Sequence, residues 1–438
     1  MPASPADSSI YALLLSDPEC AALFGDEAEV RAMLDVEIAL ARVQAALGIV
    51  PEDAAAQIEA ILSTSTLDPR ALAAGTASAG VPAPVLVSEA RKVVGGDAAR
   101  HLHWGATSQD IADTALVLRL RDLLDLLDAR LAALCDRLAE VAHTERATVM
   151  VARTRSQQAT PTTFGLKVAG WLAPLHRHRV RLDELRPRLL LVQLGGASGN
   201  LAALGDRGVE VMEALATDLE LGAPPMPWHT QRDSLVELAG WLGALTGILG
   251  KMGQDLVLLA QSEVGEVRPG AGGGSSTMPQ KANPIAPEML VALARASTHL
   301  VGAAHDAMLQ EHERGGPGWT LEWMALPQLA VNAGAALRHA TDIASEMTAD
   351  PARMRENLER SGGLVLAEAA TFALAEHMPR PQAQALVKDA CKEAIASGRH
   401  LRDVLREQTD VTLDWDAVFD PGRYVGVAEA FVARVVER

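Results

Sequence analysis

Apolar side chains recur at three- and four-residue spacing along most of this chain. From Glu27 to Leu47 they repeat in this way until a Gly-Ile-Val-Pro sequence ends the pattern, which predicts an amphipathic helix. Four later stretches keep the same periodicity over about 25 residues or more. These are Gln109–Ala147, Pro161–Leu185, Asp233–Glu263 and Pro284–Gln310. Each is apolar around much of its circumference, so neighbouring helices have to cover it.

Such long apolar helices pack best as a bundle, and symmetric copies of the chain can bury the faces that remain. Helical patterns before and after them are shorter. We therefore expect an all-α protein with an N-terminal helical domain at residues 1–106, a central long-helix bundle at 107–349 and a C-terminal helical domain at 350–438. The central bundles of several copies are expected to form one multi-helix core.

Composition and charge narrow the choice of partners. Aromatic residues make up only 3% of the 438 residues, and Lys and Arg number 39 against 56 Asp and Glu, a net charge of −17. This balance disfavours nucleic acid and anionic membrane surfaces, so an anionic small molecule would need a local basic pocket. Three well-separated cysteines favour neither disulfides nor a zinc site. No leader or membrane span is expected, and the cytoplasm is the expected location.

The segment Gly272–Pro284 is the most unusual in composition. Glycine permits wide backbone excursions, and the Pro-Gln-Lys-Ala-Asn-Pro run that follows stiffens the exit, which is typical of a hinged lid. Ser275 and Ser276 offer hydroxyls, Lys281 a cation for an oxyanion and Asn283 a further donor. A flexible surface linker is the alternative interpretation. A phosphate-binding P-loop and a GxSxG serine hydrolase motif are both absent.

The stretch GSSTMPQKANP resembles the signature of the fumarase/aspartase superfamily. In that superfamily three separated segments, from three different subunits, meet at each active site of a helical-bundle tetramer. The resemblance implies the same here: a homotetramer with shared sites, no cofactor and no metal. Ser275 would be the reactive hydroxyl, and Ser276, Met278 and Asn283 would contact the substrate.

The other two segments are also present. HWGATSQD supplies Thr107 and Ser108 before a helix, where free backbone N–H groups can bind a carboxylate, although a simple helix cap would use the same residues. His103 stands where the superfamily has a substrate-contacting histidine. ARTRSQQATPTTFG resembles the second segment and supplies Gln157, but Arg155 replaces a histidine that transfers protons in the lyases. Arginine stays protonated and is a poor general base.

Within the superfamily the chain is most similar to bacterial 3-carboxy-cis,cis-muconate cycloisomerases, which also lack that histidine. The similarity runs from about Met33 to Val427 and includes PWHTQRD and QEHERGGPGWTLEW. It implies substrate contacts by Arg155, His229 and Gln231 and a catalytic Arg314. A domain-joining role for the loop that carries His229 and Gln231, and a salt-bridge role for Arg314 at a helix end, remain open.

The resemblance implies closure of a lactone by addition of a substrate carboxylate to a double bond, as in protocatechuate degradation. Lys281 and Arg314 would flank the charge that develops, Ser275 would assist proton transfer, and Thr107 and Ser108 would hold a second carboxylate. The substrate would be a polycarboxylate. Two alternatives stay open, namely a fumarate-releasing lyase of the adenylosuccinate or argininosuccinate type, and a catalytically silent relative.

Overall fold

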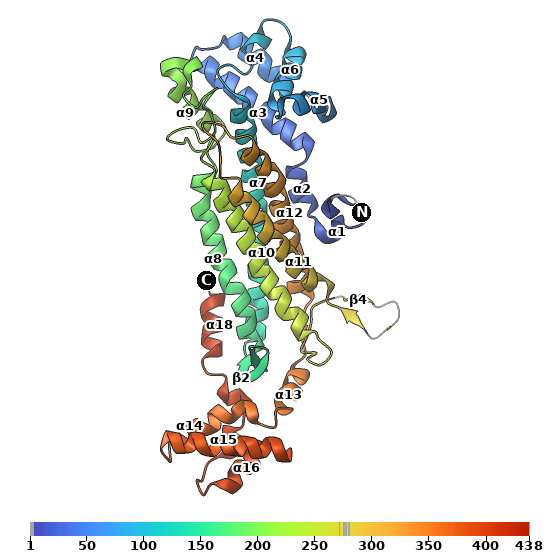
Figure 1. Ribbon diagram of the computed structural model, residues 1–438, viewed down its shortest axis with the longest axis vertical. Coiled ribbons are helices and arrows are strands. Elements are labelled where there is room, and N and C mark those ends of the chain that lie inside the picture. The colour runs from blue at the N-terminus through green and yellow to red at the C-terminus, as the bar shows by residue number, and fades with distance from the viewer. Residues whose placement is uncertain (1–3, 271, 275–277, 279–280, 438) are drawn as a thin grey trace. The chain divides into compact units, whose positions relative to one another are not determined.

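The computed structural model of this chain describes residues 4–270, 272–274, 278 and 281–437, and Figure 1 labels most of its helices. The helices are α1 (Ala12–Leu15), α2 (Pro18–Leu23), α3 (Asp26–Ala46), α4 (Glu52–Leu62), α5 (Pro69–Ala79), α6 (Ala83–Val94), α7 (Ser108–Thr144), α8 (Phe164–Leu189), α9 (Gly208–Asp218), α10 (Asp233–Leu259), α11 (Ile285–Asp306), α12 (Pro317–Glu346), α13 (Pro351–Glu359), α14 (Ala367–Ala375), α15 (Arg380–Ser397), α16 (Leu401–Gln408), α17 (Trp415–Val418) and α18 (Ala428–Val436). The strands are β1 (Val149–Thr154), β2 (Gln157–Thr163), β3 (Val267–Arg268), β4 (Gly273–Gly274), β5 (Ala282–Asn283) and β6 (Thr348–Ala349). In the described ranges these strands form only antiparallel pairs, β1 with β2, β3 with β6 and β4 with β5. The all-α prediction is confirmed.

The periodicity located most of the long helices to within a few residues. The N-terminal prediction corresponds to α3, and those for the middle of the chain to α7, α8, α10 and α11. One prediction began too early, because Pro161 lies in β2 and α8 starts at Phe164. A further long helix, α12, was not predicted: it follows a Gly- and Pro-rich stretch and carries Pro327 in its interior, which interrupts the helical pattern.

The chain divides into two compact units. The first comprises Met1–Leu131, His178–Gly247 and Ala292–Arg338. Its N-terminal part has a core of aliphatic residues from α3, α4, α5, α6 and the start of α7. A second cluster in this unit packs α3 against α9 and the segment that contains Val192 and Leu194. The α3 helix is therefore buried on most sides, which places its Glu37 and Gln44 inside the protein.

The second unit comprises Ala132–Arg177, Ile248–Val291 and His339–Arg438. Its C-terminal part is a cluster of short helices, α14 to α17, around Leu374, Val387, Leu405 and Trp415. The β1–β2 hairpin also belongs to this unit. The boundaries of the three domains expected from the sequence stay a prediction.

Among the described residues, α10 is one helix long and apolar enough to cross a membrane on length and composition alone. Of its most apolar 18-residue window, 61% is buried inside the protein. Packing therefore accounts for its apolar character, because a core helix of a large bundle is apolar on most sides.

His178 on α8 is fully buried and stacks on Trp241 of α10, with ring centroids 4.4 Å apart. Within the described residues neither ring nitrogen has a hydrogen-bond partner. Burial, aided by the charge of Arg181, lowers the pKa of His178 to about 4. The unfolded chain takes up a proton below about pH 6.5, whereas the folded chain does not until about pH 4.

We therefore expect the free energy of unfolding to fall by roughly 3 kcal/mol as the pH drops from 6.5 to 4 on account of this residue. His178→Phe keeps the stacking and cannot be protonated, so its acid sensitivity should be smaller. Urea unfolding at pH 7.0, 5.5 and 4.5 measures the difference. If the free energy of unfolding falls equally with pH in both proteins, His178 is not the residue that makes folding sensitive to acid.

Candidate active site

Helix α7 begins at the predicted Thr-Ser pair. The backbone N–H of Thr107 donates to Oδ2 of Asp110 at 2.9 Å, and the carbonyl of Thr107 accepts from the N–H of Asp110 at 3.0 Å. This reciprocal pair fixes the first turn of the helix. Because the first N–H groups of a helix have no partner within it, those of Ser108 and Gln109 are available to an anion.

Asp110 connects this helix start to two distant loops. Its buried carboxylate accepts from the N–H groups of Gly195 and Gly196, both at 2.9 Å. Its Oδ1 also lies 2.7 Å from Nε2 of the buried His229. His229 thus lies at the start of α7, where Asp110 links its loop to the Gly195–Gly196 loop. Gln231 is exposed, and its side-chain amide donates to the carbonyl of Pro227 at 3.4 Å.

Arg314 reaches the same place from the segment before α12. Its Nε donates to Oε1 of Gln109 at 3.0 Å, and its Nη2 donates to the carbonyl of Gly196 at 3.3 Å. Gln109 in turn donates to the carbonyl of His229 at 2.9 Å. A half-buried guanidinium is therefore fixed beside the N-terminus of α7. A cation beside a helix N-terminus is an arrangement that favours a carboxylate.

His103 precedes this helix in the same loop. It adopts a left-handed backbone conformation, with φ at 64°, which is uncommon for a residue other than glycine. Its Nδ1 lies 2.6 Å from Oε1 of the buried Glu37 on α3. The predicted residues His103, Thr107, Ser108, His229 and Arg314 thus belong to one region of the first unit.

In the second unit, the predicted Arg155 occupies the tip of the β1–β2 hairpin. Thr154 pairs with Gln157, so Arg155 and Ser156 form a two-residue turn with φ of 50° and 64°. Such turns normally use Asn or Gly, and other residues at positive φ are strained. Arg155 and Gln157 are both exposed there. Strain of this kind concentrates at functional sites, which agrees with a role for Arg155.

A buried carboxylate holds this hairpin close to its turn. Arg153 forms two hydrogen bonds to Glu266, both at 2.8 Å, and the side-chain amide of Asn357 donates to the same carboxylate at 2.8 Å. Arg153 is therefore committed to a structural pair. The exposed arginine of the segment is Arg155.

Part of the Gly-Ser segment is described. Gly273 and Gly274 of β4 pair with Asn283 and Ala282 of β5. Lys281 and Met278 are exposed, and Asn283 is half-buried. The predicted Ser275 and Ser276 lie outside the described residues.

Comparison with known proteins places these segments in a family. Residues 16–297 match the lyase family, and residues 363–435 match the adenylosuccinate lyase C-terminus. The chain belongs to the fumarase/aspartase superfamily.

Two curated members of the superfamily and one solved structure resemble the chain over nearly its whole length. It is 46% identical to 3-carboxy-cis,cis-muconate cycloisomerase of Pseudomonas aeruginosa, with 99% of this chain and 96% of the relative covered. It is 42% identical to the enzyme of the same name from Bradyrhizobium diazoefficiens, with 99% of each covered. The crystal structure of 3-carboxy-cis,cis-muconate lactonizing enzyme from Pseudomonas putida matches with a TM-score of 0.93 and 45% identity, covering 98% of both chains.

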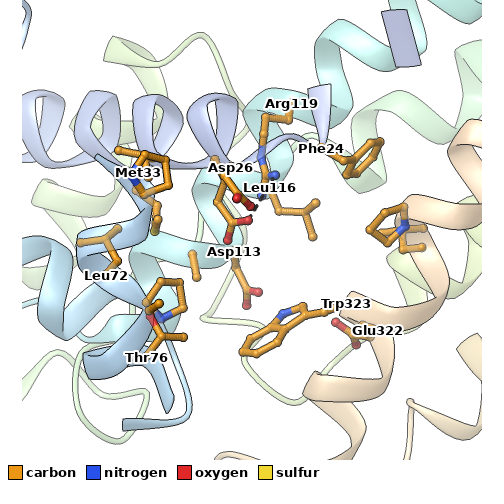
Figure 2. A pocket seen from close by; sticks show the side chains of 18 of the residues that line it. Phe24, Asp26, Met33, Leu72, Thr76, Asp113, Leu116, Arg119, Glu322 and Trp323 are labelled. Atoms are coloured by element: carbon orange, nitrogen blue, oxygen red, sulfur yellow. Dashed lines mark ion pairs between the residues drawn. The ribbon is translucent and has the colours of Figure 1, made fainter. Parts of the chain in front are cut away.

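A cavity of about 710 Å³ lies in the first unit (Figure 2). In Figure 2, Asp113 lies between Asp26 and Arg119 on one side and Glu322 and Trp323 on the other. The other residues that line the cavity are mostly apolar, and none of the predicted site residues is among them. With four carboxylates, Asp26, Glu29, Asp113 and Glu322, against the single guanidinium of Arg119, this cavity is unsuited to a polycarboxylate.

Asp113 and Glu322 both bind one buried arginine, which the sequence did not single out. Arg232 donates to Asp113 at 2.7 and 3.0 Å and to Glu322 at 2.6 and 2.8 Å, and Trp319 donates to Asp113 at 3.1 Å. Burial would lower the pKa of Arg232, but the two carboxylates outweigh it and raise this pKa. Burial raises the pKa of Glu322 despite its contact with Arg232. This cluster ties α7 and α12 to the loop before α10.

Two more residues of the site were missed, Glu37 and Gln109. Gln109 follows the Thr-Ser pair directly, so its position beside the helix start was the available signal. Glu37 lies 66 residues from its partner His103, inside an apolar helix, and gave no signal. Within the described residues, no group of three or more His, Cys, Asp or Glu side chains is arranged to hold a metal ion.

Proposed function

We propose that this enzyme converts 3-carboxy-cis,cis-muconate into a carboxymuconolactone by cycloisomerisation. The observation that carries the proposal is the agreement along nearly the whole chain with enzymes of that name. The fixed guanidinium and the free helix N-terminus at the start of α7 support it, because both favour carboxylates.

The reaction rearranges bonds within one molecule. An oxygen of one substrate carboxylate bonds to a carbon of the conjugated double bond, and the π electrons move onto another carboxylate to give an aci-anion. A proton then adds to the carbon next to that carboxylate, which restores it. Since the transition state concentrates negative charge on that carboxylate, preorganised cations and N–H groups lower the barrier.

Each superfamily segment has a role in this proposal. Thr107, Ser108 and Arg314 bind carboxylates of the substrate, and Lys281 stabilises the aci-anion. Ser275 takes part in proton transfer. Arg155 replaces the proton-transferring histidine with a permanent charge and so serves as an anion contact.

The remaining contacts and the assembly follow from the family. His103, Gln157, His229, Gln231, Ser276, Met278 and Asn283 surround the substrate. We further propose a cytoplasmic homotetramer in which three subunits contribute to each site. The exposed position of Arg155 and Lys281 in this chain is compatible with contacts to another subunit's substrate.

An ultraviolet assay tests the function directly. The wild-type enzyme should remove the diene absorbance of 3-carboxy-cis,cis-muconate, and Ser275→Ala should lower kcat by about 10²–10³-fold because it removes a group that acts in the transition state. Ser397→Ala, at an exposed position on α15, is the matched control and should keep full activity.

Adenylosuccinate and argininosuccinate serve as rival substrates in the same assay. Consumption of either of them, with 3-carboxy-cis,cis-muconate untouched, would replace the proposed activity with a fumarate-releasing lyase. Equal rates for wild type and Ser275→Ala would remove Ser275 from the mechanism.

A further inference from the structure

Glu37 is a carboxylate in an apolar environment. It lies on α3 with no exposed side-chain surface, and its neighbours along the helix, Leu34, Ile38 and Ala41, belong to the apolar core. Its Oε1 contacts Nδ1 of His103 at 2.6 Å. Its Oε2 is buried and has no hydrogen-bond partner within the described residues.

A buried carboxylate with so few partners is costly unless its partner compensates for the lost solvation. Hydrogen bonds between ionised groups are shorter and stronger than those between neutral groups. The 2.6 Å contact to His103 has the length of such a bond. Among the described residues His103 is the hydrogen-bond partner of this carboxylate, so it is the group that can supply positive charge.

The loop that carries His103 is held against α3 at a second point. Gln44 lies about two helical turns after Glu37 on α3. Its side-chain amide donates to the carbonyl of Trp104 at 2.8 Å. His103 itself has a φ of 64°. The strained backbone is thus maintained by two side chains of one buried helix, and such strain is retained where a side chain has to point in a particular direction.

We propose that Glu37 is a positioning residue, whose buried carboxylate holds His103 as an imidazolium that presents its Nε2–H to a carboxylate of the substrate. The inference rests on the function proposed above. His103 is partly exposed, with 18% of its side chain accessible, and within the described residues no hydrogen-bond acceptor contacts Nε2. Since Nδ1 is committed to Glu37, Nε2 is the nitrogen free to donate.

The charged groups around His103 agree with this role. Burial acts to lower the pKa of His103, but the hydrogen bond and charge of Glu37 on α3 and the charge of Asp110 on α7 raise it. Arg91 on α6 opposes them. The net effect is a raised pKa, so the imidazolium persists to a higher pH than that of an ordinary histidine.

The sign of the pH dependence follows. The active form is protonated, so the rate falls as the pH rises through the raised pKa of His103. Glu37→Gln keeps the shape and a hydrogen-bond acceptor but removes the charge. Burial then dominates, the pKa of His103 falls, and the alkaline limb of kcat/KM against pH should move down by about one unit or more. At pH values above the alkaline limbs of both proteins, kcat/KM of Glu37→Gln should therefore be about tenfold or more below that of the wild type.

Two measurements test the inference. The first is the pH profile of kcat/KM for wild type and Glu37→Gln. The second is the titration of the His103 imidazole by NMR in protein with isotope-labelled histidine, with His103→Gln to assign the signal among the 12 histidines. Gln328→Met on α12 is the matched control: it removes a hydrogen bond from an exposed glutamine to a backbone carbonyl, that of Met324, without changing a charge, so it should leave both the alkaline limb and the His103 titration unchanged.

The outcomes separate this inference from the proposed function. If the wild-type enzyme does not act on 3-carboxy-cis,cis-muconate but the titration shifts in Glu37→Gln, the function is wrong and the histidine–glutamate pair stands. If the wild type is active and Glu37→Gln shifts neither quantity, the pair is only structural and the inference is overturned. A wild-type imidazole that titrates at or below its ordinary pKa overturns it without any variant.

Discussion

Arg232→Ala should lower the free energy of unfolding by about 3–5 kcal/mol. Its guanidinium is fully buried and forms hydrogen bonds to both Asp113 and Glu322. Without it, two carboxylates remain buried with no cation between them, and their desolvation is no longer compensated. Urea unfolding followed by circular dichroism gives the shift in midpoint.

Arg188→Ala is the control for this prediction. Arg188 also forms an ion pair, with Glu237, but both side chains are about half exposed. Solvent screens such pairs, so the unfolding midpoint should hardly change. Equal midpoint shifts for the two variants would mean that the Arg232 cluster is not the buried, tightly coupled unit described above.

Replacing all three charged residues tests whether uncompensated buried charge is the reason for the loss of stability in Arg232→Ala. The triple variant Asp113→Leu, Arg232→Met and Glu322→Leu removes the charges together and leaves none uncompensated. It should be more stable than Arg232→Ala alone, since buried ion clusters contribute little net stability over apolar residues of similar volume. If it is less stable, packing around Arg232 accounts for the loss.

The helices could be predicted from local pattern because their apolar faces repeat with the helical period. This worked for α3, α7, α10 and α11. It failed for α12, where Pro327 breaks the pattern although tertiary packing keeps the helix continuous. It also failed for the β1–β2 hairpin, whose Arg155–Ser156 turn lacks the glycine or asparagine that normally marks such a turn.

The local sequence pattern alone could place together only residues that are neighbours in sequence. Thr107 and Ser108 stand directly before a helical pattern, and the free N–H groups of a helix start follow from that position. The partners of Asp110 lie 85 to 119 residues away at Gly195, Gly196 and His229, and no local rule connects them. Asp110 accepts from the N–H of Thr107 at the helix start, whereas Asp113, three residues further on, pairs with the distant Arg232.

Arg314→Lys should lower kcat/KM for the cycloisomerisation by about 10²–10³-fold. The guanidinium of Arg314 uses Nε for Gln109 and Nη2 for the carbonyl of Gly196, which leaves Nη1 for the substrate. A lysine ammonium is one point of charge and cannot hold both contacts while reaching a carboxylate. Because the lost interaction strengthens as charge develops, kcat should fall about as much as kcat/KM.

Two further variants decide whether Arg314 acts as described. Arg121→Lys is the control, since Arg121 also donates to a backbone carbonyl, that of Leu219, but lies outside the site. It should keep the wild-type kcat. Gln109→Leu removes the residue that orients Arg314, so its effect and that of Arg314→Lys should be less than additive in a double-mutant cycle. Additive effects would mean that Gln109 acts on the substrate independently of Arg314. If Arg314→Lys changes only KM, Arg314 binds the substrate without stabilising the transition state.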